Sequence, residues 1–168
     1  MEDIEKGRIS MTDESKFAVG QNIATTAGSI VFENELIQLI QYAPTTKTVH
    51  ELPLLLVPPC INKFYLMDLE PENSFVRFAL DKGHTVFLVS WRNVKEEQQH
   101  LTWDDYLEMG VIKAVEVTRA IAATDQINLL GFCVGGTLVT AALAVLAARG
   151  DKSVASLTLM TALLEFTD

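Results

Sequence analysis

Residues 127–136 read Ile-Asn-Leu-Leu-Gly-Phe-Cys-Val-Gly-Gly, and they hold the strongest structural pattern in the chain. An apolar run typical of a buried strand ends at Gly131, and an alanine-rich run typical of a helix begins at Val134. A strand that turns directly into a helix strains the central residue, here Cys133, and exposes its side chain. Glycine is needed two residues before and two residues after, because side chains at those places would collide. The G-x-C-x-G pattern therefore predicts a nucleophile elbow with a cysteine in place of the usual serine.

The predicted elbow also supplies the electrostatics that a thiol nucleophile needs. The helix that begins at Val134 points its N-terminus at Cys133, and its partial positive charge and free N–H groups favour the thiolate. The Val134 N–H is placed to donate to the oxyanion that forms when Cys133 attacks a carbonyl. The alternative is a buried cysteine whose flanking glycines, Gly131 and Gly135, only let the helix pack closely on the strand. The pattern favours the nucleophile.

Apolar runs and helical periodicities alternate on both sides of the elbow. The short apolar runs predict strands at 53–57, 85–89, 127–131 and 154–160. The longer stretches with helical spacing predict helices at 69–82, 102–123 and 134–148, and Gly83 and Gly150 end the first and the last of these. Strands separated by helices in this way are typical of a parallel sheet with right-handed crossovers and helices on both faces. The predicted fold class is α/β.

The first part of the chain has a different pattern. Residues 30–42 mix apolar and polar residues in partial alternation, which predicts an antiparallel, half-exposed strand or hairpin. Residues 1–28 are polar and predict a loosely ordered lead-in, so that the core is expected to comprise residues 29–168. Further along, Thr102 is followed three residues later by Asp105, a variant of the capping box. We interpret residues 103–106 as a helix start with a core anchor rather than a catalytic group.

In parallel sheets, functional residues follow the carboxyl ends of the strands. The loops at those ends are 58–62, 90–93 and 132–136. Cys60 in the first loop is expected near the elbow, although a small apolar filler explains it more simply than a catalytic group. Lys63 suits an anionic substrate, but a solvated lysine is the simpler interpretation. Trp91 and Arg92 suit a pocket wall or, equally well, core packing and an ion pair.

A cysteine at an elbow needs a histidine base and an acid that orients it. The three histidines, His50, His84 and His100, all precede Cys133, whereas the usual chain order is nucleophile, acid and then histidine. His84 comes just before a predicted strand, which is the wrong end of the sheet for a base. Glu165 and Asp168 follow the last predicted strand too soon to be the usual acid. Either the catalytic machinery is unusual or the sequence stops before it is complete, and the second is favoured because the last predicted strand ends within a few residues of the C-terminus.

The composition excludes several classes of protein. Hydrophobic residues make up 49% of the 168 residues, which is a core-forming composition, and the formal net charge of −9 disfavours binding to nucleic acid or anionic membrane. The longest apolar stretch, 134–148, is shorter than the roughly 18 residues that a membrane span needs. The N-terminus has no secretory pattern. Cys60 and Cys133 lie too far apart to suggest a metal site or a disulfide framework, so the expected location is the cytoplasm.

Longer motifs now make a family resemblance visible. From about Phe17 to Asp168 the chain resembles the polyhydroxyalkanoate synthases, especially the single-subunit type that polymerises short 3-hydroxyacyl units. The matching stretches are FAVGQNIATTAGSIVFENELIQLIQY, PLLLVPPCINKFYLMDLEPENSFVRFALDKGHTVFLVSWRN, TWDDY and INLLGFCVGGTLVTAALAVLAARG. The motifs PPCINK and GFCVGGT are highly specific in combination.

The resemblance implies an α/β-hydrolase core and an acyltransferase. It implies that Cys133 attacks the thioester of a 3-hydroxyacyl-coenzyme A and releases coenzyme A, while the Val134 N–H stabilises the oxyanion. A second oxyanion donor is expected from Cys60 or Ile61, which would also line the substrate pocket. The family's histidine then activates a hydroxyl that lengthens the polyester, such as polyhydroxybutyrate, and no cofactor or metal is expected. By resemblance, the full-length protein is a homodimer at polyester granules.

The resemblance also implies that the family's Asp, His and cap region lie beyond Asp168. The chain is then an internal fragment: residues 1–28 end the family's N-terminal region, and residues 29–168 form the first part of an incomplete catalytic core. We expect such a fragment to be inactive alone. Two alternatives stay open: another cysteine-elbow hydrolase, such as a thioesterase or esterase, against which PPCINK and SWRN weigh, and a non-catalytic interaction fragment with an exposed sheet edge.

Overall fold

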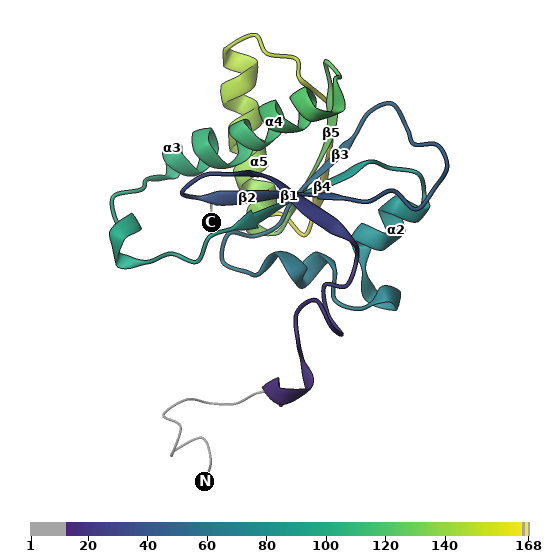
Figure 1. The fold of residues 1–168 in the computed structure, drawn as a ribbon. Helices are drawn as coiled ribbons and strands as arrows, with labels where there is room; N and C mark the ends of the chain where they lie inside the picture. The colour runs from purple at the N-terminus through teal and green to yellow at the C-terminus, as the bar shows by residue number, and fades with distance from the viewer. Residues whose placement is uncertain (1–12, 166, 168) are drawn as a thin grey trace.

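The computed structural model describes residues 13–165 and 167, so the first twelve residues of the expected lead-in lie outside the described residues. Within the described part, six strands form one sheet in the order β1-β2-β4-β3-β5-β6 (Figure 1). The strands are β1 (Gly28–Glu33), β2 (Ile37–Tyr42), β3 (Leu54–Val57), β4 (Val86–Trp91), β5 (Ile127–Phe132) and β6 (Val154–Met160). The main helices are α2 (Phe75–Asp81), α3 (Trp103–Asp105), α4 (Lys113–Ala122) and α5 (Val134–Ala148).

The sheet confirms the two strand patterns that the sequence predicts. β1 and β2 form an antiparallel hairpin, and β2 pairs antiparallel with β4. From β4 onward the neighbours β4-β3-β5-β6 are all parallel, because each connection crosses over through helical segments. The carboxyl ends of β3 and β5 lie side by side, since Val57 is in register with Gly131. This register brings two of the three predicted functional loops to one place.

Helices cover both faces of the sheet, as predicted. Successive strand residues point to opposite faces, so Leu55 and Phe87 belong to one buried cluster while Leu56 and Leu88 belong to the other. The first cluster packs against α4 and α5, and the second packs against α2. Burying apolar side chains on both faces of a sheet is the main force that holds such a layered fold together. The structure thus has the α/β class predicted from the sequence.

The helix predicted at 69–82 is shorter in the structure. It begins at Phe75, where the Ser74 side chain accepts a hydrogen bond from the Arg77 N–H, and Gly83 ends it with φ +83°. The preceding residues form a 3-10 turn at Pro71–Asn73. The residue before a proline is driven out of the helical region, and Glu70 has extended dihedral angles. The prediction of the helix start was therefore wrong, and Pro71 gives the physical reason.

The long helix predicted at 102–123 is confirmed, running without a gap from Trp103 to Ala122, but its hydrogen-bonding pattern changes in the middle. Between α3 and α4 the chain forms a π-helical segment, η5 (Tyr106–Ile112). The Asp105 carboxylate accepts hydrogen bonds from the Thr102 N–H and hydroxyl, which confirms the predicted cap and lowers the pKa of Asp105. Of the two aromatic residues in the segment 103–106, which was predicted to hold a core anchor, Trp103 is half exposed. The aromatic residue that packs inward there is Tyr106, one turn later.

Candidate active site

The turn between β5 and α5 has the strained geometry that the sequence predicts. Cys133 lies between the last residue of the strand and the first of the helix, with φ +53° and ψ −124°. Few residues with a Cβ adopt positive φ, and such strain persists only where neighbours hold it. Here the Cys133 N–H donates to the Met160 carbonyl at 2.8 Å, and the Gly136 N–H donates to the Cys133 carbonyl at 2.8 Å. The backbone therefore anchors the cysteine from both β6 and α5.

The two elbow glycines are needed, but not for the reason expected. A Cβ on Gly131 would lie 2.5 Å from the Val139 side chain and 2.6 Å from the Cα of Gly136. A Cβ on Gly135 would lie only 2.1 Å from the carbonyl oxygen of Val57, at the end of β3. The two positions thus collide with α5 and with β3 rather than with each other. The first turn of α5 therefore packs directly against the backbone at the carboxyl end of β3.

The loop after β3, residues 58–62, lies at the same edge of the sheet as the elbow. Its Cys60 is partly buried and packs against the core, which raises the pKa of its thiol through burial. Ile61 is 77% exposed and therefore contributes nothing to the core. A cavity of about 510 Å³ opens here, and it is lined by Cys60, Ile61, Asn62, Lys63, Asn93, Val94 and Tyr106. Cys60 and Ile61 thus line a pocket, although their chemical role stays a prediction.

The remaining candidates in these loops have structural partners. β4 extends to Trp91, so Ser90 and Trp91 belong to the strand rather than to the loop predicted at 90–93. Trp91 is buried, which corresponds to the packing interpretation. Arg92 forms an exposed ion pair with Glu97 at 3.1 Å. Lys63 is exposed, which agrees with the solvated interpretation, and it donates a hydrogen bond to the Asn93 side chain at 2.5 Å.

His50 and His84 lie at the amino ends of the parallel strands, away from the elbow, whereas His100 follows β4. His84 precedes β4 at the amino edge of the parallel strands, as predicted, and its ring is 4.8 Å from that of His50. His100 lies beyond β4 in an exposed segment, where its ring contacts the carbonyl of Glu97. The contact between the tilted rings of His50 and His84 is a feature that sequence reasoning missed, because the two residues are far apart in the chain and have no local pattern in common.

The His50–His84 pair predicts a pH-dependent stability. Burial, and then the charge of His50, lower the pKa of His84, and its Nδ1 atom is buried without a partner. A lowered folded-state pKa means that the unfolded chain binds the proton more tightly. The contribution of His84 to the free energy of unfolding should therefore be complete well above the unfolded pKa of about 6.5, and it should be lost as the pH falls through that value toward the lower folded-state pKa.

Urea denaturation at several pH values measures this loss. His84→Gln should flatten the slope in that window, whereas His100→Gln, at an exposed site with no second histidine beside it, should keep the parent slope. Carboxylates such as Asp105 titrate well below this window and do not obscure it. An unchanged slope in His84→Gln would contradict the prediction.

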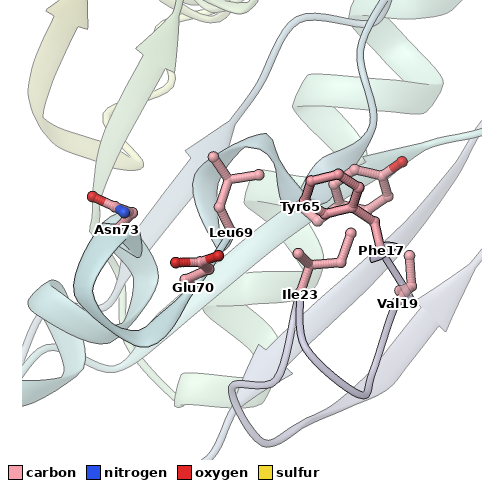
Figure 2. Close-up of a pocket in the computed structure, with 7 residues that line it drawn as sticks. All are labelled: Phe17, Val19, Ile23, Tyr65, Leu69, Glu70 and Asn73. Atoms are coloured by element: carbon pink, nitrogen blue, oxygen red, sulfur yellow. The ribbon is translucent and has the colours of Figure 1, made fainter. Parts of the chain in front are cut away.

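A second cavity lies apart from the elbow. It measures about 600 Å³ and is lined by Phe17, Val19, Ile23, Tyr65, Leu69, Glu70 and Asn73 (Figure 2). The segment before β1 forms one wall, and the 3-10 turns before α2 form the other. None of the predicted site residues lines it. In the part of the chain that the structure describes, no helix has both the length and the apolar character needed to cross a membrane.

The comparison with solved structures defines the class of protein. One of two fungal esterases from Rhizomucor miehei superposes with a TM-score of 0.60 at 11% identity, over 94% of this chain and 50% of the esterase. LAE6, an alpha/beta hydrolase from the Lake Arreo metagenome, gives 0.59 at 17% identity, over 92% and 49%. A family model for the alpha/beta hydrolase fold matches residues 53–168. The fold, with a strained residue at the strand–helix turn, is that of an α/β hydrolase.

Sequence comparison narrows this class. A family model described as the N-terminus of poly-beta-hydroxybutyrate polymerase (PhaC) matches residues 1–79. The chain is 60% identical over 168 residues to the poly(3-hydroxyalkanoate) polymerase subunit PhaC of Cupriavidus necator, and 44% identical over 170 residues to that of Rhizobium meliloti. All of this chain aligns with the first relative and 99% with the second, and it spans 28% of the length of each. The chain belongs to the polyhydroxyalkanoate polymerase family.

Proposed function

We propose that Cys133 is the nucleophile of a polyester polymerase and accepts the acyl group of a 3-hydroxyacyl-coenzyme A. The observation that carries this proposal is a cysteine held at φ +53° at the N-terminus of α5, in a chain of this family. The first N–H groups of a helix have no acceptor within the helix, and the helix dipole favours an anion there. Both effects stabilise negative charge that develops beside Cys133 during acyl transfer.

The acylation step follows from these groups. The Cys133 thiolate attacks the thioester carbonyl, and a tetrahedral oxyanion forms. The Val134 N–H and one N–H of the loop at residues 58–62, from Cys60 or Ile61, donate hydrogen bonds to this oxyanion. The bond to the coenzyme A sulfur then breaks, coenzyme A leaves as a thiolate that takes a proton from solvent, and the acyl group stays on Cys133. Neither a metal nor an organic cofactor takes part in this proposal.

Chain growth requires a base in addition. A hydroxyl of one acyl unit must lose its proton to attack the next acyl thioester, and general base catalysis contributes roughly 10²- to 10⁴-fold. His50 and His84 lie at the amino ends of β3 and β4, whereas Cys133 follows the carboxyl end of β5. His100 follows β4, and β3 lies between β4 and β5 in the sheet. We therefore propose that these 168 residues alone form an acyl-enzyme but do not turn over.

The test is to give the purified chain 3-hydroxybutyryl-coenzyme A and to follow coenzyme A release and the mass of the Cys133 peptide. At most one equivalent should be released, and the acyl group should be found on Cys133. Sustained release with polymer would show that one of the three histidines serves as the base after all. Sustained release with free 3-hydroxybutyrate would instead indicate a thioesterase. Polymer formation itself is tested with the same segment inside a full-length polymerase.

A further inference from the structure

The indole of Trp91 is fixed on three sides. Its Nε1–H donates a buried hydrogen bond to the carbonyl of Pro58 at 2.8 Å. Its ring stacks on that of Tyr106, with 5.6 Å between the ring centroids and 27° between the planes. A Cβ on Gly110 would lie 2.7 Å from the indole, so only glycine lets the π-helical segment η5 come this close. Such π-helical segments occur frequently at functional sites.

The carbonyl that Trp91 holds belongs to the first residue of the loop at 58–62. On its other side, the same chain segment rests on the first turn of α5, because a Cβ on Gly135 would meet both Val57 and Pro58. Pro58 and Pro59 have no N–H, so neither can donate a hydrogen bond that anchors the start of the loop. The Pro59 carbonyl accepts a hydrogen bond from the Asn62 N–H at 3.1 Å, within the loop itself, whereas the Pro58 carbonyl accepts from Trp91 and so ties the start of the loop to β4.

We infer that Trp91 is a positioning residue for acyl transfer: it orients the loop at residues 58–62 so that an N–H of Cys60 or Ile61 faces the oxyanion. This inference rests on the proposed function of Cys133. Oxyanion donors act only when they lie about 2.7–3.1 Å from the developing charge. A displacement of about 1 Å costs on the order of 10²-fold in rate. A buried hydrogen bond at the base of the loop provides this precision.

The test separates oxyanion stabilisation from thiol reactivity. Acylation of Cys133 by 3-hydroxybutyryl-coenzyme A passes through an oxyanion, whereas alkylation by iodoacetamide does not. Trp91→Phe should lower the acylation rate about 10- to 100-fold, in line with losing or misplacing one oxyanion donor. It should leave the alkylation rate of Cys133 within about twofold of the parent, because the elbow and α5 are unchanged. Trp103→Phe, at the half-exposed tryptophan, is the matched control and should alter neither rate.

A measurement without substrate tests the positioning directly. Amide hydrogen exchange should become faster at residues 60–62 in Trp91→Phe, while residues 134–148 keep the protection of the parent. If Trp91→Phe does not fold, benzothienylalanine at position 91 keeps the shape of the indole and removes only the N–H donor.

Equal acylation and equal exchange in the parent and in either variant would overturn the inference. A parallel loss of acylation and alkylation would also overturn it, because that result indicates general structural damage. If the parent chain is not acylated at all, the proposed function fails, and the exchange comparison alone then decides whether Trp91 holds the loop.

Discussion

Replacing Cys133 with alanine is expected to reduce acyl-enzyme formation from 3-hydroxybutyryl-coenzyme A to background, a loss of at least about 10³-fold. No other group in the described structure combines a thiol with a helix N-terminus and a turn of positive φ. Alanine carries a Cβ just as cysteine does, so the cost of positive φ at position 133 is the same in both. The variant should therefore unfold at the same urea concentration as the parent, which isolates the chemical effect.

Cys60→Ser is the matched control, since Cys60 is the other cysteine at this edge of the sheet. It should keep a measurable part of the acylation, and in a full-length polymerase a measurable part of polymer formation. In the parent, alkylation at mildly acidic pH should modify Cys133 before Cys60, because burial raises the pKa of the Cys60 thiol. Acyl transfer to Cys60, or its preferential alkylation, would contradict the assignment of Cys133.

Gly135→Ala is expected to destabilise the fold by about 3 kcal/mol or more. Its Cβ would lie 2.1 Å from the Val57 carbonyl oxygen and 2.8 Å from the Pro58 carbonyl. Both are backbone atoms, and β3 is paired on both sides, so neither partner can rotate away as a side chain would. Relief requires α5 to move off the sheet, which opens the core. Because domains of this kind are stable by only about 5–15 kcal/mol, the loss should be plain in urea denaturation.

Gly150→Ala provides the comparison for this prediction. Gly150 ends α5 with φ +72°, and no atom lies within 4 Å of its added Cβ. Its replacement costs only the backbone strain of positive φ, about 1–2 kcal/mol. If Gly135→Ala lowers the free energy of unfolding no more than Gly150→Ala does, then α5 can move away from β3 without destabilising the fold. In that case the close contact at the elbow is not what demands glycine there.

Local sequence patterns were sufficient to predict the type and position of the helices and strands around the elbow. Helix 134–148 and strand 154–160 have the predicted bounds, and the hairpin at 30–42 and the cap at Thr102 are confirmed. In each case the deciding interactions lie within a few residues along the chain, so that periodicity, capping residues and turn glycines report them. The positive φ of Cys133 follows from the same local pattern. The family followed from the motifs PPCINK and GFCVGGT.

Contacts between distant segments decided the rest. The order β2-β4-β3-β5, the close approach of Gly135 to Val57 and the ring contact between His50 and His84 all join residues more than thirty positions apart. The π-helical segment η5 lies where Gly110 packs against the Trp91 indole. The hydrogen bond from Trp91 to the Pro58 carbonyl connects β4 to the loop after β3. No local pattern encodes such contacts, because they depend on which strands become neighbours when the apolar faces are buried together. The sequence alone thus determined the strained turn at Cys133 and the fold class, and the tertiary structure determined which contacts surround the facing loop at residues 58–62.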